Sequence, residues 1–450
     1  MSIQSEINRI TDARDDSFDA VAAKGVTVPT GSTIDDLPTL IGQIQTGGGG
    51  SVTVNPLSVT QNGTYTAPTG TAYSPVTVNV SGGGSSSAQR NDVNFFDYDG
   101  TIVYSYTAAE ALALTELPAN PSHTGLVAQG WNWTLAQMKA QVTAMGKCDI
   151  GQMYITASGD TEIDVSFPDS ARLSPIMTIA VNGTITVDWG DGTTADTVTG
   201  TSLTSRKAVP HTYAGTGDYT IVIHTVSGSF SFYCMSSYTI LRKNTTGNQN
   251  RVYANTIQKI RLGNGITSIA NCAFYNCHSL TSITIPSGVT SIADSAFYNC
   301  HGLTSIAIPS GVTSIGTYAF YSCYSLTSIA IPSGVTSIGN YAFQNCYSLA
   351  SITISSGVTS IGSYEFSACY SLASITIPSG VTSIAAQVFY NCCGLGAIHF
   401  KSSTPPTVAN SNAFTGVPND CIIYVPAGTL SDYTSASNYP SSSTYTYVEE

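Results

Sequence analysis

The chain has 450 residues, of which 42% are apolar, so it can bury substantial cores in about two to four domains. Only 9% of the residues are charged, and a formal net charge of −12 argues against nucleic acids and anionic membrane surfaces as partners. No apolar run reaches the length of a membrane span and residues 1–10 lack the hydrophobic core of a signal peptide, so we expect a soluble chain without membrane insertion or an obvious leader.

Residues 1–46 are predicted to form a helical segment that ends at a run of glycines. Ile3, Ile7 and Ile10 give a partial helical stripe. A stripe this narrow has too little apolar area to be stable alone, so we expect it to form a homo-oligomer, as a trimer, or to pack on another protein. Residues 23–44 resemble the opening segments of tail proteins from phages of Gram-positive bacteria. This resemblance implies that the N-terminus attaches to a tail or baseplate protein.

Residues 47–90 are predicted to hold two flexible linkers around a small β module at residues 52–80. Glycine and serine make up almost all of both linkers, a composition typical of a flexible coil. Within the module, Asn62-Gly63 predicts a turn and residues 76–80 predict a strand. The strings QNGTYTA and YSPVTVNV resemble modules that are strung along phage tail fibres.

Residues 91–157 are predicted to form an α+β segment. The string WNW is followed by a short helix that begins after Thr134, in which Met138 and Val142 share one face. This combination resembles a recurrent segment of phage tail fibres.

The same segment contains the one string that suggests catalysis. It reads DYDGT and resembles the nucleophile loop of haloacid-dehalogenase-type phosphatases, in which Asp97 would attack phosphorus and Asp99 would move the proton. Residues 159–164 match the metal motif G-D-x-x-x-D of that family. Only some sixty residues separate the two strings, too few for the βα units that bring them together, and residues 163–167 alternate as a strand. We therefore expect a two-acid turn and no enzyme activity.

Residues 158–230 are predicted to form a β-sandwich. The strings WGDGT and HTY, followed by GDY, resemble the signature of PKD-type domains, which implies a spacer or presenter. Trp189 has the bulk to fill a sandwich core, and Tyr213 is expected to pack near it. Asp188 and Asp191 are expected to form a turn, with Ca²⁺ binding as the alternative role.

A repeat of 23 residues organises the C-terminal half, and residues 231–400 are predicted to form a solenoid with an N-terminal cap at residues 231–260. In one unit, residues 280–286 predict a short strand, residues 289–292 a second extended piece, and residues 296–300 a helical or 3₁₀ turn. Each repeat places a Phe three residues before a Cys and a Leu three residues after it. These cysteines are Cys277, Cys300, Cys323, Cys346, Cys369 and Cys392.

The consensus LxxIxIPxGVxxIxxxAFxxCxxL resembles the BspA-type leucine-rich repeat, over about 140 residues. Residues 401–450, with the strings STPP and CIIYVP, resemble the C-terminal cap of such arrays. The six cysteines take equivalent inward positions beside Phe and Leu. We therefore expect buried, reduced thiols that act as small hydrophobic groups, and neither disulfides nor a metal site.

The surface of the array is predicted to be uncharged and aromatic. Between Leu262 and Phe400 there is no Lys or Arg, and the only acids are Asp294 and Glu365. Stacking of the coils is expected to place equivalent rings in columns, about 4.8 Å apart. The candidate ligand-binding residues are His278, His301, Tyr298, Tyr318, Tyr321, Tyr324, Tyr341, Tyr347, Tyr364 and Tyr370. The alternative is that these rings only cover the outer turns.

The face formed by the strands is predicted to be flat and lined by small residues. They are Ser282, Thr284, Ser305, Ala307, Ser328 and Ala330. Alanine interrupts the regular rows of Ser and Thr, which argues against an ice-binding array.

A multi-domain, mainly β chain of this kind is predicted to be a phage tail-fibre or receptor-binding protein, made in the host cytoplasm and located in the virion tail. Its array would bind a bacterial cell-surface glycan or protein, because a neutral, hydroxyl-rich surface suits such partners better than phosphate. No cofactor, metal or nucleic acid is expected. A bacterial surface adhesin with the same repeats is the first alternative. The second is a haloacid-dehalogenase-like phosphatase that uses Asp97 and Asp99.

Overall fold

The computed structural model describes residues 63–65, 76–78, 92–232, 240–242, 253 and 255–450. The chain divides into one unit at residues 1–85 and a second at residues 86–450. The predicted N-terminal helix, both linkers and the residues that resemble phage tail proteins lie outside the described residues.

In the first unit, strands β1 (Gly63–Tyr65) and β2 (Val76–Val78) form an antiparallel pair. The strand expected around Val76 is therefore confirmed. The turn expected at Asn62-Gly63 stays a prediction, because Asn62 lies outside the described residues; Gly63 itself begins β1 and pairs with Val78.

Residues 92–157 form a four-stranded sheet with two helices packed against it, in the order β4-β3-β6-β5. The strands are β3 (Val93–Phe96), β4 (Ile102–Tyr106), β5 (Leu126–Trp131) and β6 (Cys148–Thr156), and the helices are α3 (Ala108–Ala113) and α4 (Leu135–Met145). Both helices begin at a threonine whose side chain accepts a hydrogen bond from a first-turn amide, in a capping box. The helix predicted after Thr134 is confirmed as α4, with Met138 and Val142 buried against the sheet.

A seven-stranded sheet follows and continues into the first coil of the solenoid, in the order β11-β8-β10-β7-β12-β13, with β9 paired to β8. Its strands are β7 (Thr161–Phe167), β8 (Ile176–Asp188), β9 (Asp196–Pro210), β10 (Gly217–Phe232), β11 (Leu241–Arg242), β12 (Ile257–Arg261) and β13 (Ser282–Thr284), and the short 3₁₀ helix η2 (Ser170–Arg172) lies between β7 and β8. The strand expected from the alternation at residues 163–167 is confirmed as β7.

The pairing of these strands differs from the two separate sheets of a sandwich. Strand β10 pairs with β7 along its first half and with β8 along its second, so one continuous sheet results. The resemblance to PKD-type domains stays a prediction. Trp189 and Tyr213 are fully buried in its core, as expected.

Strand β12 joins this sheet to the solenoid. It pairs antiparallel with β7 on one side and parallel with β13 on the other. Arg261 on β12 also donates to Glu162 at 2.7 Å and to both carboxylate oxygens of Asp164 at 2.7 and 2.8 Å, across the same strand pair. Burial alone would raise the pKa of Asp164, but the hydrogen bonds and charge of Arg261 lower it.

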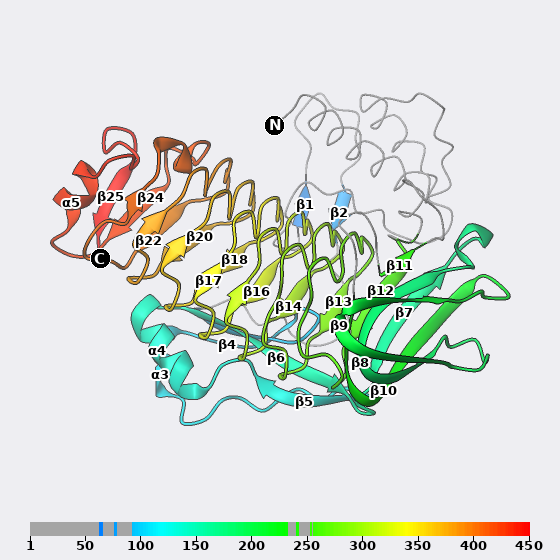
Figure 1. The fold of residues 1–450 in the computed structure, drawn as a ribbon. Coiled ribbons are helices and arrows are strands. Elements are labelled where there is room, and N and C mark those ends of the chain that lie inside the picture. The colour runs from blue at the N-terminus through cyan, green and yellow to red at the C-terminus, as the bar shows by residue number, and fades with distance from the viewer. Residues whose placement is uncertain (1–62, 66–75, 79–91, 233–239, 243–252, 254) are drawn as a thin grey trace, which may run out of the picture. The chain divides into compact units, whose positions relative to one another are not determined.

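The solenoid has two rows of short parallel strands, one pair to each coil (Figure 1). The first row continues from β13 through β14 (Ser305–Ala307), β16 (Ser328–Ala330), β18 (Ser351–Ile352), β20 (Ser374–Ile377) and β22 (Ala397–Phe400). The second row is β15 (Ser314–Ile315), β17 (Ser337–Ile338), β19 (Ser360–Ile361), β21 (Ser383–Ile384) and β23 (Thr407–Val408). Both extended pieces predicted for each repeat are therefore present.

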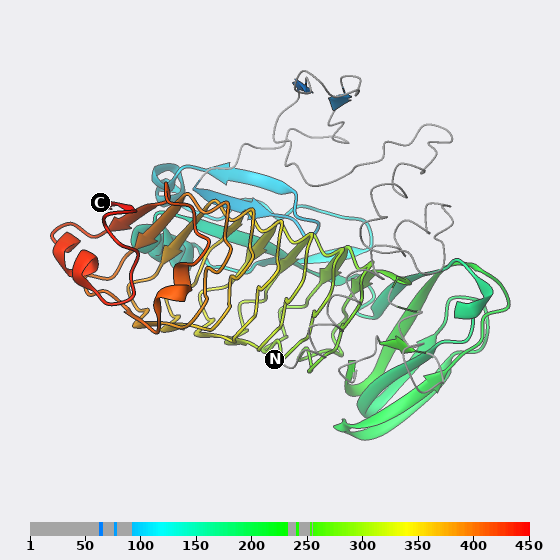
Figure 2. The same cartoon turned by 90° about the horizontal axis from the view of Figure 1, so that it is seen from above.

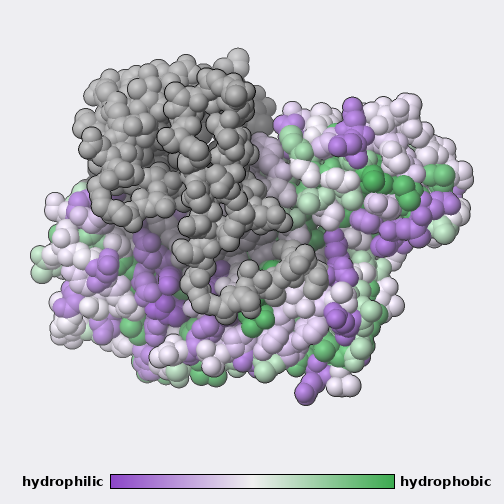
Figure 3. All heavy atoms as spheres, turned by 180° about the vertical axis from the view of Figure 1, so that it is seen from behind, coloured by the Kyte–Doolittle hydropathy of each residue, from purple (hydrophilic) through white to green (hydrophobic). Residues whose placement is uncertain are grey.

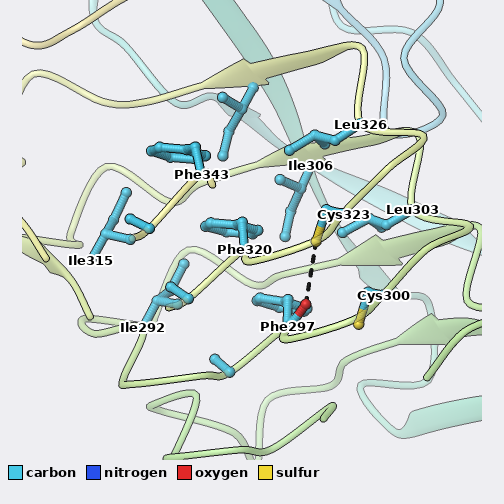
Figure 4. Packing of buried hydrophobic residues seen from close by; sticks show 14 of the residues in the cluster. Ile292, Phe297, Cys300, Leu303, Ile306, Ile315, Phe320, Cys323, Leu326 and Phe343 are labelled. Carbon is cyan, nitrogen blue, oxygen red and sulfur yellow. Dashed lines mark hydrogen bonds between the residues drawn. The ribbon is translucent and has the colours of Figure 1, made fainter. Parts of the chain in front are cut away.

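The interior of the solenoid consists of equivalent residues stacked coil on coil (Figure 4). Phe297, Phe320 and Phe343 stack with centroids 5.2 and 5.4 Å apart. Burial of each such side chain contributes about 1.5–3 kcal/mol. The six cysteines of the repeats, which we call the ladder cysteines, are buried and free, as predicted. They also form hydrogen bonds, as Cys323 Sγ does when it donates to the carbonyl of Phe297 at 3.2 Å.

The helical or 3₁₀ turn predicted for residues 296–300 is wrong. The segment is a series of turns, because Ser295 and Asn299 have left-handed φ values of 54° and 57° that no right-handed helix accommodates. Alternate backbone amides bond to the next coil, as Phe297 N does to the carbonyl of Ala319 at 2.8 Å, whereas those of Tyr298 and Cys300 donate to carbonyls three residues back.

The C-terminal residues cover the last coil. Strand β24 (Ile422–Val425) pairs with β22, and β25 (Thr446–Glu449) pairs with β24. The 3₁₀ helix η4 (Ser411–Phe414) and helix α5 (Leu430–Ser435) lie in the same region. Tyr433 is buried there, with its hydroxyl donating to the carbonyl of Ser402 at 2.7 Å. Among the helices that the structure describes, none combines the length and the apolar character needed to cross a membrane.

Candidate recognition surface

The strand face of the solenoid, formed by β13, β14, β16 and β18, is covered by the sheet of residues 92–157. Figures 1 and 2 show this sheet alongside the row of strands, and β6 contacts β13, β14 and β16. Asn132 Nδ2 donates to the carbonyls of Ile308 and Ala330, at 2.9 and 3.0 Å. Gln141 Nε2 donates to the carbonyl of Ile354 at 3.1 Å. Side-chain amides thus bind backbone carbonyls of three successive coils.

The fit between the two parts depends on small residues. Gly151 on β6 lies so close to the solenoid that a Cβ atom there would be 2.6 Å from the Cβ of Ala307 and 3.2 Å from that of Ala330. Thr284 and Thr353 take the same position in flanking coils. The alanines that interrupt the threonine row therefore mark the place where β6 approaches. They were the one sequence signal for this contact.

The other side of each coil carries aromatic residues in three columns, which together we call the ring face. The Tyr275 column is Tyr275, Tyr298 and Tyr321; the Tyr318 column is Tyr318, Tyr341 and Tyr364; the His278 column is His278, His301, Tyr324, Tyr347 and Tyr370. The columns predicted from the repeat are therefore present. Their role in ligand binding stays a prediction.

Each column is a stack of nearly parallel rings. Successive centroids are 4.3–4.9 Å apart, and the ring planes differ by 1–14°. The rings are half-buried, except that Tyr370 at the end of its column is 45% exposed. Tyr318 meets Tyr298 and Tyr321 edge-on, at 6.2 and 5.6 Å, so the Tyr275 and Tyr318 columns form one patch. Tyr390 has the sequence position of the Tyr275 column, but Gln344 and Ser367 separate it from Tyr321.

The Tyr318 column has an unfavourable backbone conformation. Tyr318, Tyr341 and Tyr364 have φ values of 58°, 62° and 56°. In this left-handed region a bulky side chain is uncommon and costs on the order of 1–2 kcal/mol, whereas Asn is tolerated. Ser295 and Gln387 take the same position in flanking coils, also with positive φ. The fold thus requires the conformation but does not require tyrosine.

The ring face contains no Lys or Arg. Burial, and then the charge of His278, lower the pKa of His301 to about 3, so His301 is neutral at physiological pH. Asp294 is exposed, and its Oδ1 accepts from the amide of Thr317 at 2.7 Å. Glu365 is fully buried, because it takes the position before the core Phe that is Ala or Val in the other coils. On the face of the molecule shown in Figure 3, hydrophobic side chains are scattered among hydrophilic ones over the described residues.

The carboxylates of the two phosphatase-like strings have other partners. Asp97 is buried, and its Oδ2 lies 2.6 Å from His123 Nε2. Asp99 accepts from the amide of Thr101. From the second string, Asp160 lies 2.6 Å from His224 Nδ1, and Asp164 pairs with an arginine as described above. Across the described residues, no three His, Cys, Asp or Glu side chains are grouped so as to hold a metal ion.

The WGDGT string forms a closed turn. Asp188 accepts from the amide of Gly190, and Asp191 accepts from the amide and hydroxyl of Thr193. His211 lies 2.8 Å from Asp191 Oδ2 and stacks on Trp189, with centroids 4.7 Å apart. The aspartates thus have the turn-forming role that the sequence favoured.

Comparison with known families identifies the repeats. The family model described as BspA type Leucine rich repeat region matches residues 245–346 and residues 290–419. The repeat region is therefore a BspA-type leucine-rich repeat solenoid. A comparison with curated proteins found no match.

Several solved structures are similar to parts of the chain. A Leucine Rich Repeat protein of T. pallidum is 36% identical, over 25% of this chain and 52% of that one, with a TM-score of 0.24. A leucine-rich repeat protein from Bacteroides ovatus ATCC 8483 is 24% identical, over 43% of this chain and 59% of that one, with a TM-score of 0.32. A leucine rich cell surface protein from Faecalibacterium prausnitzii A2-165 is 27% identical, over 40% of this chain and 62% of that one, with a TM-score of 0.24. The chain thus spans 52–62% of the length of these three proteins.

Proposed function

We propose that this chain is a non-enzymatic recognition protein of the adhesin type, which binds a target cell surface through the ring face of its leucine-rich repeat solenoid. The observation that carries the proposal is the difference between the two faces. The strand face is filled by the protein's own β6, whereas the ring face presents half-exposed, uncharged aromatic residues. Tyrosine is enriched among the residues that carry binding energy at interfaces.

The family match supports the adhesin hypothesis, which the sequence offered as its first alternative, and an extracellular or surface location goes with it. The tail-fibre hypothesis, with a virion location and a tail or baseplate partner, depends on N-terminal residues and on strings that the family model does not cover. Formation of a homotrimer through residues 1–46 belongs with that hypothesis and stays a prediction. In either case the PKD-like sheet would hold the solenoid away from the rest of the assembly.

The two hypotheses differ in where the protein is found. We expect antibodies against the chain to label intact cells of the organism that produces it. Labelling confined to particles released after prophage induction would overturn the adhesin hypothesis in favour of a tail fibre.

Recognition itself is tested with the full-length chain, labelled with a fluorophore and applied to a panel of bacterial and host cells. We expect saturable binding that excess unlabelled chain displaces. The Tyr341→Asp variant places a charge on the neutral ring face at a position where Asp tolerates the left-handed backbone, so binding should fall at least tenfold. The control is Ser356→Asp, which adds the same charge at an exposed turn outside the ring columns. Equal binding by the two variants would exclude the ring face as the recognition surface.

A further inference from the structure

We propose that the ring face binds an uncharged polysaccharide, which lies along the solenoid axis and is held by the tyrosine hydroxyls rather than by the ring faces. This inference rests on the proposed function and names the chemical class of its ligand.

The stacking geometry decides which part of each ring a ligand can reach. Tyr341 lies between Tyr318 and Tyr364 at centroid distances of 4.6 and 4.9 Å, with ring planes within 14° of parallel. Both faces of its ring are therefore covered. A ligand can therefore reach such a partly buried ring only at its edge, where the hydroxyl group lies.

A ring held in this way suits a hydrogen-bonding ligand. Aromatic anchors in protein interfaces work by filling a pocket of the partner with the whole ring, which a ring locked between two neighbours cannot do. The hydroxyl groups of Tyr318, Tyr341 and Tyr364 can each donate and accept a hydrogen bond. Beside the columns, Asn299 Nδ2 donates to the buried Asn276 Oδ1 at 2.9 Å and Asn345 Nδ2 to the buried Ser322 Oγ at 3.3 Å, so these polar groups bond to one another from coil to coil.

The regular spacing indicates a ligand that is itself a polymer. Equivalent rings recur every 4.3–4.9 Å along each column, so the same polar group is offered at constant intervals. A chain of sugar units presents hydroxyl groups repeatedly along its length and can bond several coils at once. Binding at several linked positions raises affinity without any single strong contact.

The lack of Lys and Arg in the array indicates that the bound polymer is uncharged. Residues 262–400 contain no Lys or Arg, and His301 is neutral at physiological pH. A sulfated or carboxylated polysaccharide would find no counter-charge there, and the net charge of −12 would repel it. An uncharged polysaccharide meets neither obstacle.

The test compares hydroxyl removal with ring removal. The triple variant Tyr318→Phe, Tyr341→Phe, Tyr364→Phe keeps the stacked rings and removes three hydroxyl groups. Binding of the full-length chain is measured on immobilised glucan, mannan and galactan, and on heparin and polygalacturonate as charged probes. We expect binding to at least one uncharged polymer and to neither charged one. The triple variant should bind that polymer roughly tenfold more weakly, as loss of about 0.5 kcal/mol per hydrogen bond gives.

The matched control is Tyr424→Phe, which removes a hydroxyl from a tyrosine that stacks on His399 outside the ring face. It should bind like the unmodified chain, and all variants should have the same melting temperature. Binding to a charged probe alone, or full binding by the triple variant, would overturn the inference.

Treatment of target cells separates this inference from the proposed function. We expect periodate oxidation of the cells to remove binding and protease treatment to leave it intact. If protease removes it and periodate does not, the ligand is a protein. In that case the polysaccharide inference fails while recognition through the ring face, as judged by Tyr341→Asp, still stands.

Discussion

The strand face and the ring face are built from the same 23-residue repeat, yet the repeat is broken differently on each. On the strand face the departures make residues smaller: Ala307 and Ala330 replace threonine where Gly151 of β6 is seated. On the ring face the larger residue is tyrosine. It takes a left-handed position that Ser295 and Gln387 take in the flanking coils.

On both faces, the positions that vary between repeats serve contacts outside the solenoid core. The solenoid core needs neither set of changes, because the buried Phe, Cys and Leu residues are the same in every coil. The alanines provide space for a partner that belongs to the chain. The tyrosines of the Tyr318 column carry a backbone cost on the order of 1–2 kcal/mol each, and we infer that binding outside the solenoid offsets it.

The largest effect is expected from a change that breaks the covered face. Gly151→Ala would place a Cβ atom 2.6 Å from the Cβ and 3.1 Å from the Cα of Ala307, so backbone must move. We expect the free energy of unfolding to fall by about 1–3 kcal/mol or more, measured by urea denaturation of the full chain.

The control for this change is Gly215→Ala, since a Cβ atom there meets nothing within 4 Å. The second substitution Ala307→Gly in the Gly151→Ala background should restore much of the loss, because it returns the missing space. A Gly151→Ala protein as stable as the control would show that β6 does not bind this face tightly.

A second prediction concerns the core beneath the ring face. Burial raises the pKa of Glu365 well above its ordinary value of 4.5, although the amide of Gly362, which donates to it at 2.7 Å, lowers it. Below about pH 4.5 both folded and unfolded chains hold the proton, so Glu365 carries no pH-dependent penalty. As the pH rises further, the unfolded chain loses the proton first, and stability falls until the folded pKa is reached.

Glu365→Gln should therefore raise the melting temperature at neutral pH by a few degrees and flatten its dependence on pH above 4.5. Asp294→Asn is the control, because Asp294 is an exposed acid of the same array. The measurement is the melting temperature of the native chain and of both variants at several pH values between 4 and 8. If the melting temperatures of the native chain and Glu365→Gln depended on pH in the same way, Glu365 would not have a raised pKa in the folded chain.

A comparable effect is expected from the ladder cysteines, which lie between the two faces. Cys323→Ala removes a buried sulfur and its bond to the carbonyl of Phe297, which should cost about 1–3 kcal/mol. Cys323→Ser should cost less, because the hydroxyl can donate to the same carbonyl. Cys393→Ala, at an exposed cysteine, is the control and should leave the melting temperature unchanged. Equal stability of Cys323→Ala and the control would mean that the thiols are not part of the packed core.

Much of the solenoid could be predicted from the sequence, because stacked coils repeat their core contacts at a fixed interval. The period alone placed every ladder cysteine inside and every aromatic column on one side. The turn at residues 296–300 was missed, although Asn276, Asn299 and Asn345 recur where the left-handed conformation is needed. An asparagine at a fixed repeat position is a signal for that conformation.

The segment that covers the strand face could not be predicted, because the alanines of the repeat mark a place of close approach without identifying a partner more than 150 residues away. The hydrogen bond from Asn132 to Ile308 joins residues separated by 176 positions. Gly151 is a single glycine within a strand, which by itself indicates only a close approach of some backbone. The burial of Glu365 was missed for a different reason: it follows Tyr364 at a core position, and an acid there contradicts the pattern that places its neighbours.

The last prediction sharpens the comparison at the ring face, where stability and binding should separate. Tyr341→Asn together with Tyr364→Asn removes two stacked rings, which costs about 0.5–1.5 kcal/mol for each ring pair, and relieves two left-handed tyrosines, which returns a similar amount. The melting temperature should therefore stay within about 2 °C of that of the native chain. Binding to target cells should nevertheless fall about fivefold or more, since two hydroxyl groups are lost at about 0.5 kcal/mol per hydrogen bond. Ser356→Asn together with Ser379→Asn, at exposed turns outside the ring columns, forms the matched control and should retain binding. A double asparagine variant that melts much lower yet binds normally would mean that these tyrosines serve the fold, and that the recognition surface lies elsewhere.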